Sequence, residues 1–203
     1  MYIPGHFKWK DTEQVLEFIR QYPFGQLVSG GQQPLVTHLP FVARKEGEEL
    51  VLVSHMAREN PQWQHLQDQN VLVVFQHPHA YISPSWYSHT VNVPTWNYLA
   101  VHCYGTIELI DDRAGAESIM YEMFEAYDPT YIEQYRALPE NYTEKLYRGV
   151  VAFKIGVTDM QAKAKVSQNK PAEDRLNVIA QLEKPGDAGN TDLAMWMKKI
   201  YQL

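Results

Sequence analysis

The sequence predicts an α+β fold in which short antiparallel strands form a barrel with helices attached to it. Short apolar segments are scattered along the whole chain and joined by short links, which is typical of antiparallel sheets. Helical patterns lie between and after these segments. No glycine fingerprint for a nucleotide occurs at a strand-to-helix junction, and a doubly wound parallel sheet is therefore disfavoured.

The first helix is predicted from Asp11, which has the position of an N-cap, with Gln14 three residues later. The helix is expected to end before Pro23, and its apolar set is Val15, Leu16, Phe18 and Ile19. Three short strands are predicted next, over residues 25–29, 35–43 and 49–54. The Gly30-Gly31 pair and residues 46–48 supply the turns, so these strands form an antiparallel meander.

The middle of the chain combines a short helix, two strands and a long loop. Asn60 and Pro61 have the positions of an N-cap and a first helical residue, and this helix is expected to reach Leu66. Residues 70–76 are nearly all apolar and predict a strand buried on both faces. Residues 78–94 predict a functional loop with a short strand near 80–83, and residues 96–110 predict another long strand.

The second half of the chain is predicted to be mostly helical around one further strand. Asp111 and Asp112 cap a helix over residues 113–127, and shorter helices follow over 129–138 and 142–148. Residues 150–155 return to a strand that continues over 157–167 after a bend at Gly156. A helix over 172–182 precedes a final helix whose apolar face is formed by Leu193, Trp196, Met197 and Ile200.

Composition narrows the setting and the partners. The chain has 203 residues, of which 45% are hydrophobic, and 18 basic against 24 acidic residues give a net charge of -6. This balance disfavours a general nucleic-acid or anionic-membrane surface. Cys103 is the single cysteine, so we expect no intrachain disulfide and a buried, inert thiol. No basic leader precedes an apolar run and no apolar run is long enough to span a bilayer, so a cytoplasmic setting is expected.

Residues 54–98 are unusually rich in tryptophan and histidine, a composition that suits a flat aromatic ligand with polar edges. Arg58 precedes a helix start and is a candidate for binding a phosphate, although it can equally pair with an acidic side chain. Thr37 and His38 lie on opposite faces of one predicted strand. Either can bond a phosphate or a ring edge, and the alternative for His38 is a satisfied core histidine.

Two further groups of residues are candidate ligand sites. His77 and His79 have the spacing of a His-x-His metal motif, but no third ligand has a recognisable spacing, so no metal site is predicted. Residues 163–170 carry three lysines, and Lys163 and Lys165 are expected on one face of a strand. They can meet a phosphate or a carboxylate, or simply protect a solvated edge strand.

Several long strings of this sequence resemble the PaiB family, which is described as FMN-binding negative transcriptional regulators. They occur in order along nearly the whole chain: MYIPGHF, PFGQLVS, THLPF, SHMARENPQW, VVFQHPHAYISPSWY, VPTWNY and KVSQNKPAEDR. The resemblance implies a six-stranded antiparallel FMN-binding split β-barrel with peripheral helices, which pairs as a homodimer with flavin sites at the interface. The implied domain covers residues 1–203, with a helical insertion at about 112–148 and a C-terminal helical segment at about 171–203.

The resemblance also implies which residues bind the cofactor. A strand hydroxyl and basic residues after the next strand usually hold the FMN phosphate. The candidates for contacts from the partner subunit are Trp96, Asn97 and Tyr98, and those that can close the pocket are Lys165, Ser167 and Gln168. The predicted FMN-binding residues are Thr37, His38, Ser54, His55, Arg58, Asn60, Trp96, Tyr98, Lys165 and Ser167.

Three functions remain open at this stage. The first is a flavin-binding dimer that regulates transcription negatively, with the flavin as a redox- or metabolite-linked signal. The second is a flavin-dependent oxidoreductase that acts on a small molecule. The third is a haem-binding protein on the same barrel, with His38, His55, His77 or His79 as the axial ligand. The acidic balance predicts weak or absent direct DNA binding.

Overall fold

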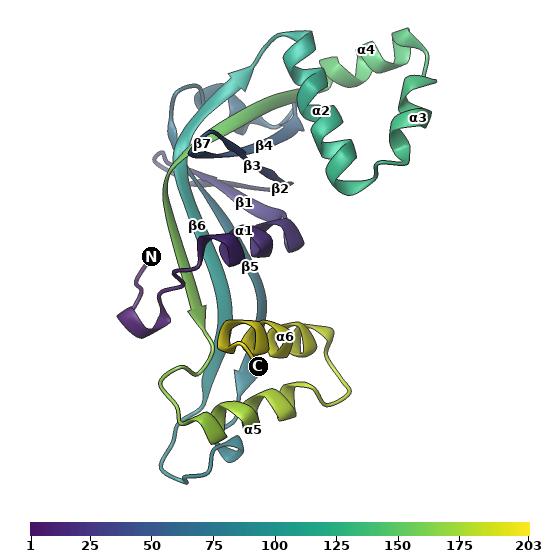
Figure 1. Ribbon diagram of the computed structural model, residues 1–203. Coiled ribbons are helices and arrows are strands. Elements are labelled where there is room, and N and C mark those ends of the chain that lie inside the picture. The colour runs from purple at the N-terminus through teal and green to yellow at the C-terminus, as the bar shows by residue number, and fades with distance from the viewer. The chain divides into compact units, whose positions relative to one another are not determined.

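The computed structural model describes residues 1–203, and its strands form one seven-stranded sheet (Figure 1). The strands are β1 (Phe24–Ser29), β2 (Leu35–Pro40), β3 (Val42–Glu46), β4 (Glu49–Ala57), β5 (Asn70–Ile82), β6 (Thr95–Ile110) and β7 (Val150–Lys165). Their order is β2-β1-β5-β6-β7-β4-β3. The pairs β1–β2, β1–β5, β3–β4 and β4–β7 are antiparallel, which confirms the predicted sheet type.

The helices follow the predicted positions closely. The α-helices are α1 (Thr12–Gln21), α2 (Arg113–Tyr127), α3 (Tyr131–Arg136), α4 (Glu140–Arg148), α5 (Ala172–Leu182) and α6 (Ala188–Tyr201). Short 3-10 helices are η1 (Gly5–Phe7), η2 (Pro61–His65) and η3 (Pro84–Trp86). The predicted caps are confirmed: Asp11 accepts a hydrogen bond from the Gln14 amide, Asn60 from the Gln62 amide, and Asp112 from the Gly115 amide.

The sheet curls into a split barrel, but with seven strands where six were expected. Strands β2 and β3 follow each other in sequence with Phe41 between them, yet they lie at opposite edges of the sheet. The chain therefore joins the two edges at Phe41, whose amide donates to the Pro23 carbonyl at 2.9 Å and whose side chain is 1% exposed. The single strand predicted over residues 35–43 is divided by this closure.

Two other strands differ from their prediction. Strand β5 continues to Ile82, so part of the predicted loop belongs to the sheet. Buried and more exposed residues alternate along β5, whereas the prediction was a strand buried on both faces. Strand β7 runs through Gly156 without a break. A side chain on Gly105 of β6 would place its Cβ 2.2 Å from the Gly156 carbonyl oxygen, so this close approach of two backbones requires glycine.

The chain folds into two compact units. We call residues 16–75 and 102–160 the barrel unit, and residues 1–15, 76–101 and 161–203 the terminal unit. Strands β5, β6 and β7 contribute residues to both. The assignment of residues 1–203 to a single domain stays a prediction.

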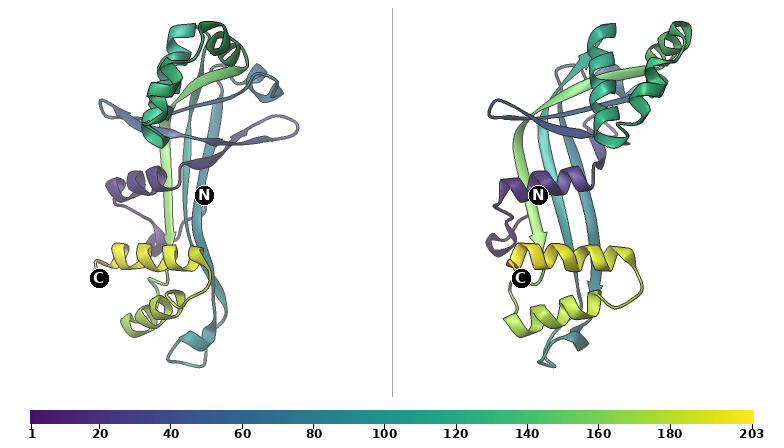
Figure 2. Two further views of the ribbon diagram at one scale, coloured as in Figure 1. Left: turned by 90° about the vertical axis from the view of Figure 1, so that its right-hand side faces the viewer. Right: turned by 45° about the vertical axis from the view of Figure 1, so that its right-hand side comes forward.

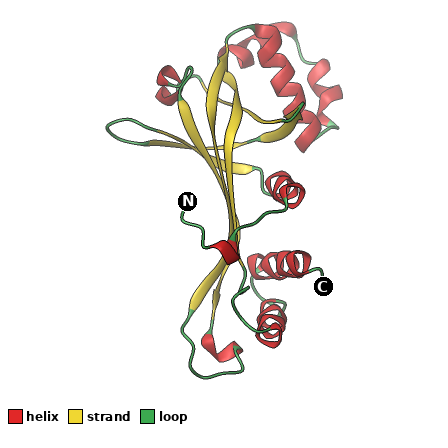
Figure 3. Ribbon diagram, turned by 60° about the vertical axis from the view of Figure 1, so that its left-hand side comes forward, coloured by secondary structure: helices red, strands yellow, loops and turns green.

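The barrel unit holds the helices of the predicted insertion, α2, α3 and α4, which gather beside its strands (Figure 3). Helix α2 buries Ile119 and Met123 against Val51 and Val53 of β4 and Ala152 of β7. Within the same unit Cys103 is fully buried, and burial followed by the charge of Asp159 raises the pKa of its thiol to about 12. The prediction of a buried thiol is therefore confirmed, and at neutral pH the group is protonated.

The terminal unit is built on two helices of the predicted C-terminal segment, α5 and α6, which lie side by side (Figure 2). Leu193, Trp196 and Met197 of α6 are fully buried, and the Trp196 ring meets Trp9 edge-on with centroids 5.4 Å apart. Aromatic contacts of this kind add to the stabilisation that burial provides. None of the helices is both long and apolar enough to cross a membrane.

Candidate functional site

Two of the predicted cofactor residues in the barrel unit, Thr37 and Asn60, belong to a set of hydrogen bonds that also includes Ser29 and Gln62 and that we call the loop network. The Thr37 hydroxyl accepts from the Asn60 amide at 2.8 Å and donates to the Gln62 side-chain oxygen. Gln62 is 2% exposed, and its amide nitrogen is directed at the Ser29 hydroxyl and at the carbonyls of Leu27 and Leu35. The loop network therefore fastens the start of η2 onto β1 and β2.

The predicted set lacks two residues of this network, Ser29 and Gln62, of which Gln62 makes most of the bonds. It lies in the same ARENPQW string as Asn60, but its burial depends on carbonyls of two distant strands. A buried amide with several protein partners is typical of a structural polar group.

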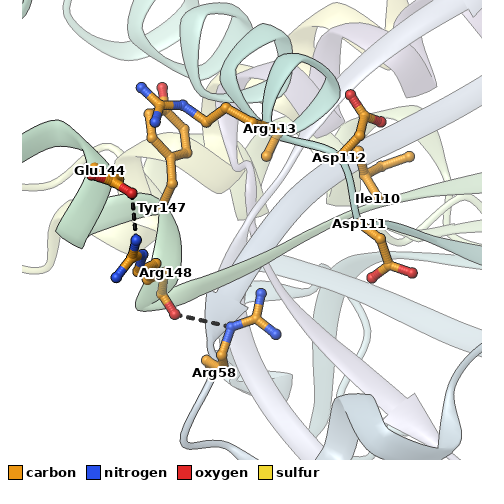
Figure 4. Close-up of a pocket in the computed structure, with 9 residues that line it drawn as sticks. Arg58, Ile110, Asp111, Asp112, Arg113, Glu144, Tyr147 and Arg148 are labelled. Atoms are coloured by element: carbon orange, nitrogen blue, oxygen red, sulfur yellow. Dashed lines mark hydrogen bonds and ion pairs between the residues drawn. The ribbon is translucent and has the colours of Figure 1, made fainter. Parts of the chain in front are cut away.

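Arg58 is held by the backbone at the junction of α4 and β7. Its Nε donates to the Arg148 carbonyl and its Nη2 to the Val150 carbonyl, each at 2.9 Å, and its guanidinium lies 5.5 Å from the Trp63 ring centroid. Arg58 lines a pocket of about 580 Å3 together with Arg113 and Arg148. Figure 4 draws these three arginines.

Acidic groups balance the arginines of this pocket. Glu144 forms an ion pair with Arg148 (Figure 4), and the other two carboxylates in the lining are Asp111 and Asp112. Three arginines thus face three carboxylates, so the pocket concentrates no net positive charge for a phosphate.

Three more predicted residues of the barrel unit have separate environments. Ser54 is fully buried and donates to the Pro40 carbonyl at 2.6 Å. His38 is exposed and stacks on Phe24 with ring centroids 6.4 Å apart. His55 is half-buried with its Nδ1 3.2 Å from the Met123 sulfur, and burial lowers its pKa. The roles of these residues in flavin binding stay predictions.

The terminal unit brings Lys165 and Ser167 together in a pocket of about 130 Å3, which we call the lysine pocket. Its polar lining residues are Tyr87, Thr95, Asn97, Lys165, Ser167, Asn169 and Lys170, and none of its residues carries a carboxylate. Lys165 donates to the Thr95 hydroxyl and to the Trp96 carbonyl at 2.6 Å. Burial, with the charge of Lys163 second, lowers the pKa of Lys165.

The centre of the lysine pocket contains buried polar atoms without a protein partner. Asn97 is fully buried and donates to the Ser167 hydroxyl at 2.8 Å, whereas its Oδ1 has no partner. The Tyr87 hydroxyl also has none within hydrogen-bond distance, although Ser167 lies close enough to oppose the rise that burial causes in its pKa. Ser167 has a φ of 69° in the left-handed region, which a serine rarely adopts. Orphan polar atoms and a strained backbone together are typical of ligand sites.

Two predicted partner contacts, Trp96 and Tyr98, also lie in the terminal unit. Trp96 is 53% exposed, and its ring lies 6.0 Å from that of Tyr81 and 5.9 Å from that of His79. Tyr98 has the Lys163 ammonium 5.2 Å from its ring centroid. No group of three or more His, Cys, Asp or Glu side chains is placed to hold a metal ion.

The donors and acceptors of the lysine pocket fit parts of FMN. Lys165, Lys170 and the hydroxyl proton of Ser167 can donate to a phosphate, while Asn97 Oδ1 needs a donor such as a ribityl hydroxyl. The volume is below the roughly 300–1,000 Å3 of complete small-molecule sites, so the pocket has room for a phosphate but not for the flavin rings. The predicted FMN-binding residues are thus divided between the barrel unit and the terminal unit.

Comparisons with known proteins agree on a flavin-binding chain. Residues 1–159 match the family described as "Putative FMN-binding domain". The chain is 40% identical over 202 residues to the Bacillus subtilis "Protease synthase and sporulation protein PAI 2", covering 98% of this chain and 97% of that relative.

Solved structures with the same fold include the flavocytochrome Anf3 from Azotobacter vinelandii, with a TM-score of 0.63, 16% identity, and coverage of 93% of this chain and 81% of that one. The FAD and heme binding protein from Mycobacterium smegmatis has a TM-score of 0.61 at 15% identity, covering 90% of this chain and 82% of that one. The fold is thus that of split-barrel flavin proteins, and the match over most of the sequence shows that the chain belongs to the PaiB family of FMN-binding proteins.

Proposed function

We propose that this protein is an FMN-binding homodimer that acts as a redox- or metabolite-linked negative regulator of transcription. The observation that supports the regulatory role is the 40% identity over nearly the full length to a relative whose name refers to protease synthesis and sporulation. FMN supplies a ring system that accepts and returns electrons, so its redox state can act as a signal. The protein's own residues bind and orient it.

We place the FMN phosphate in the lysine pocket. No carboxylate lines the lysine pocket, although Lys170 also lies near Asp174 outside it, whereas the pocket at Arg58 contains as many carboxylates as arginines. Charge-assisted hydrogen bonds favour the first environment. The sequence-based prediction that Arg58 is the main phosphate partner is the competing placement.

FMN titration by fluorescence separates the two placements. We expect Lys165→Met to weaken FMN binding more than Arg58→Ala does, because carboxylates line the pocket at Arg58 and none lines the lysine pocket. A larger loss in Arg58→Ala would move the phosphate to the barrel unit. No FMN binding by the unchanged protein would reject the cofactor site altogether.

The regulatory role requires a test in cells. In the source organism, deletion of the gene should raise a defined set of transcripts, and the unchanged gene should restore them. A gene encoding Lys165→Met should fail to restore them if FMN carries the signal. Restoration by a variant shown not to bind FMN would reject the flavin-linked signal.

The alternative function is a flavin-dependent oxidoreductase. It is tested by mixing the FMN-loaded protein with a nicotinamide cofactor and following its oxidation. Turnover well above that of free FMN would favour the enzyme over the regulator, and turnover equal to free FMN would favour the regulator.

The proposed homodimer uses an apolar surface of the terminal unit. Trp96, Tyr81 and Val93 are 53%, 48% and 75% exposed, and aromatic side chains are enriched in protein interfaces. Sedimentation at micromolar concentration should show a dimer. Trp96→Ser should shift the equilibrium toward monomer, and a wild-type monomer would reject this assembly.

Direct DNA binding by the isolated protein is expected to be weak or absent. Non-specific affinity comes from phosphates neutralised by lysine and arginine, and here 18 basic residues face 24 acidic ones. An anisotropy titration at about 150 mM salt should show no binding below the micromolar range. Submicromolar, salt-dependent binding would instead support a repressor that contacts DNA itself.

A further inference from the structure

A second pocket, of about 230 Å3, lies within the barrel unit where α2, α3 and α4 meet β4 and β7. We call it the aromatic pocket. Phe124, Tyr131, Tyr135 and Tyr147 supply its rings, Leu146 adds an aliphatic side chain, and His55 reaches it from β4. It shares Tyr147 with the pocket at Arg58 and has no residue in common with the lysine pocket. Nothing in the FMN site proposed above uses it.

The walls of the aromatic pocket are held by contacts among themselves. Phe124 packs on Tyr131 and Tyr135 with ring centroids 5.0 and 4.9 Å apart. The Tyr135 and Tyr147 hydroxyls are hydrogen-bonded at 2.5 Å, and the Arg113 guanidinium lies 4.2 Å from the Tyr147 ring centroid. Because these rings already have partners, they are positioned to keep the space open.

The chemistry of the lining selects against charged ligands. It contains no carboxylate, lysine or arginine. Burial lowers the pKa of His55, so the imidazole is neutral at physiological pH and has one donor and one acceptor nitrogen. Its Nδ1 lies against the Met123 sulfur, which leaves Nε2 as the nitrogen for a ligand. An uncharged aromatic ring can pack against the apolar walls, and one polar substituent on that ring can form a hydrogen bond with the His55 imidazole.

The volume sets the ligand size. An apolar cavity of about 150 Å3 holds benzene, so the 230 Å3 found here has room for a substituted ring or two fused rings. We propose that the aromatic pocket binds a small uncharged aromatic molecule of this size, with a hydrogen-bonding group directed at His55. The site would give the protein a second small-molecule ligand besides FMN.

Indole is a suitable probe, because it is uncharged, has two fused rings and carries one N–H. We would titrate it into the full-length protein and follow the methyl signals of Met120 and Met123, which line or adjoin the pocket. We expect a saturable shift of both signals with a stoichiometry of one per chain. No shift up to the solubility limit of indole would overturn the proposal.

A matched pair of variants on α4 locates the binding. Leu146→Trp fills the pocket, whereas Tyr142→Trp changes a residue of the same helix that is 50% exposed and outside the lining. We expect indole binding to weaken roughly tenfold or more in the first variant and to stay unchanged in the second. Equal binding by Leu146→Trp would place indole elsewhere. If that variant fails to fold, Met120→Phe fills the same pocket from α2 and replaces it in the comparison.

Charged analogues test the chemical class. Benzoate and benzylamine are expected to bind roughly tenfold or more weakly than indole, because burying an unpaired charge is costly. Binding of benzylamine as tight as that of indole would overturn the assignment to an uncharged ligand and indicate a cation site among the aromatic rings.

Discussion

The loop network and the lysine pocket both contain hydroxyl and amide side chains, and each includes residues that the sequence suggests as cofactor ligands. In the loop network both polar side-chain atoms of Gln62 have protein partners. In the lysine pocket the buried Asn97 Oδ1 and Tyr87 hydroxyl have none. Since native proteins rarely leave buried polar atoms unpaired, the first set is complete without a ligand and the second is not. We therefore expect the loop network to stabilise the fold and the lysine pocket to bind a ligand.

The largest effect is expected from breaking the loop network. Gln62→Ala should lower the free energy of unfolding by about 3 kcal/mol, because it removes the donor to the Ser29 hydroxyl and the acceptor of the Thr37 hydroxyl proton. Urea unfolding measures this loss. Gln64→Ala, an exposed position in the same η2 helix, should change it by less than about 0.5 kcal/mol.

The same variant tests the assignment of roles. The folded fraction of Gln62→Ala should bind FMN as the unchanged protein does. If FMN affinity fell at 4 °C, where the variant is folded by circular dichroism, the loop network would belong to the cofactor site after all.

The next effect is expected in the lysine pocket and should appear in binding instead of stability. Lys165→Met should cost about 2 kcal/mol of FMN affinity, which is roughly thirtyfold in Kd. The control is Lys163→Met, two residues earlier in β7, whose ammonium donates to the Tyr2 carbonyl and does not line the pocket. Equal losses of FMN affinity in both variants would indicate a general effect of positive charge, and Lys165 would then have no specific role in the lysine pocket.

Local chemistry explains why much of the fold could be predicted. Asp11, Asn60 and Asp112 cap helices because their side chains accept bonds from amides two or three residues later, a relation contained within four residues. The closure at Phe41 has no such local signal. It depends on Pro23 and on the other edge of the sheet, so residues 35–43 give the pattern of a single strand.

The sites were predictable only in part for the same reason. Lys165 and Ser167 were found from a basic string, but their partners Thr95 and Asn97 lie 70 residues away on β6. Thr95 and Asn97 alternate along that strand and so share a face, which was the available signal. Which of the two polar clusters satisfies its own hydrogen bonds cannot be read from residue types, because Ser, Thr and Asn occur in both.

A smaller effect should come from the strained backbone beside Asn97. Ser167→Gly and Ser167→Ala both remove the hydroxyl. The difference between their free energies of unfolding therefore measures how unfavourable the φ of 69° is for a residue with a Cβ. We expect the glycine variant to be more stable than the alanine variant by about 1 kcal/mol in urea unfolding. Both should bind FMN more weakly. Equal stabilities would mean that Ser167 carries no strain, and the lysine pocket would lose one of its two distinguishing features.

The smallest effect is expected from His55, whose imidazole lies among apolar rings and so has neither the full pairing of the loop network nor the charge of the lysine pocket. Burial lowers its pKa in the folded protein below the ordinary histidine value of about 6.5, so the unfolded chain takes up a proton first as the pH falls. The stability that the neutral imidazole contributes is therefore complete above pH 6.5 and is lost as the pH falls through the folded pKa.

His55→Gln removes this titration while keeping a polar group of similar size. The difference in unfolding free energy between the unchanged protein and the variant should be constant above pH 7 and should shift in favour of the variant below about 6.5, which is the ordinary histidine pKa. Urea unfolding from pH 8 to pH 5 measures it. A difference that is constant over the whole range would mean that the imidazole ionises freely, and the aromatic pocket would then hold a solvated group in place of a buried neutral one.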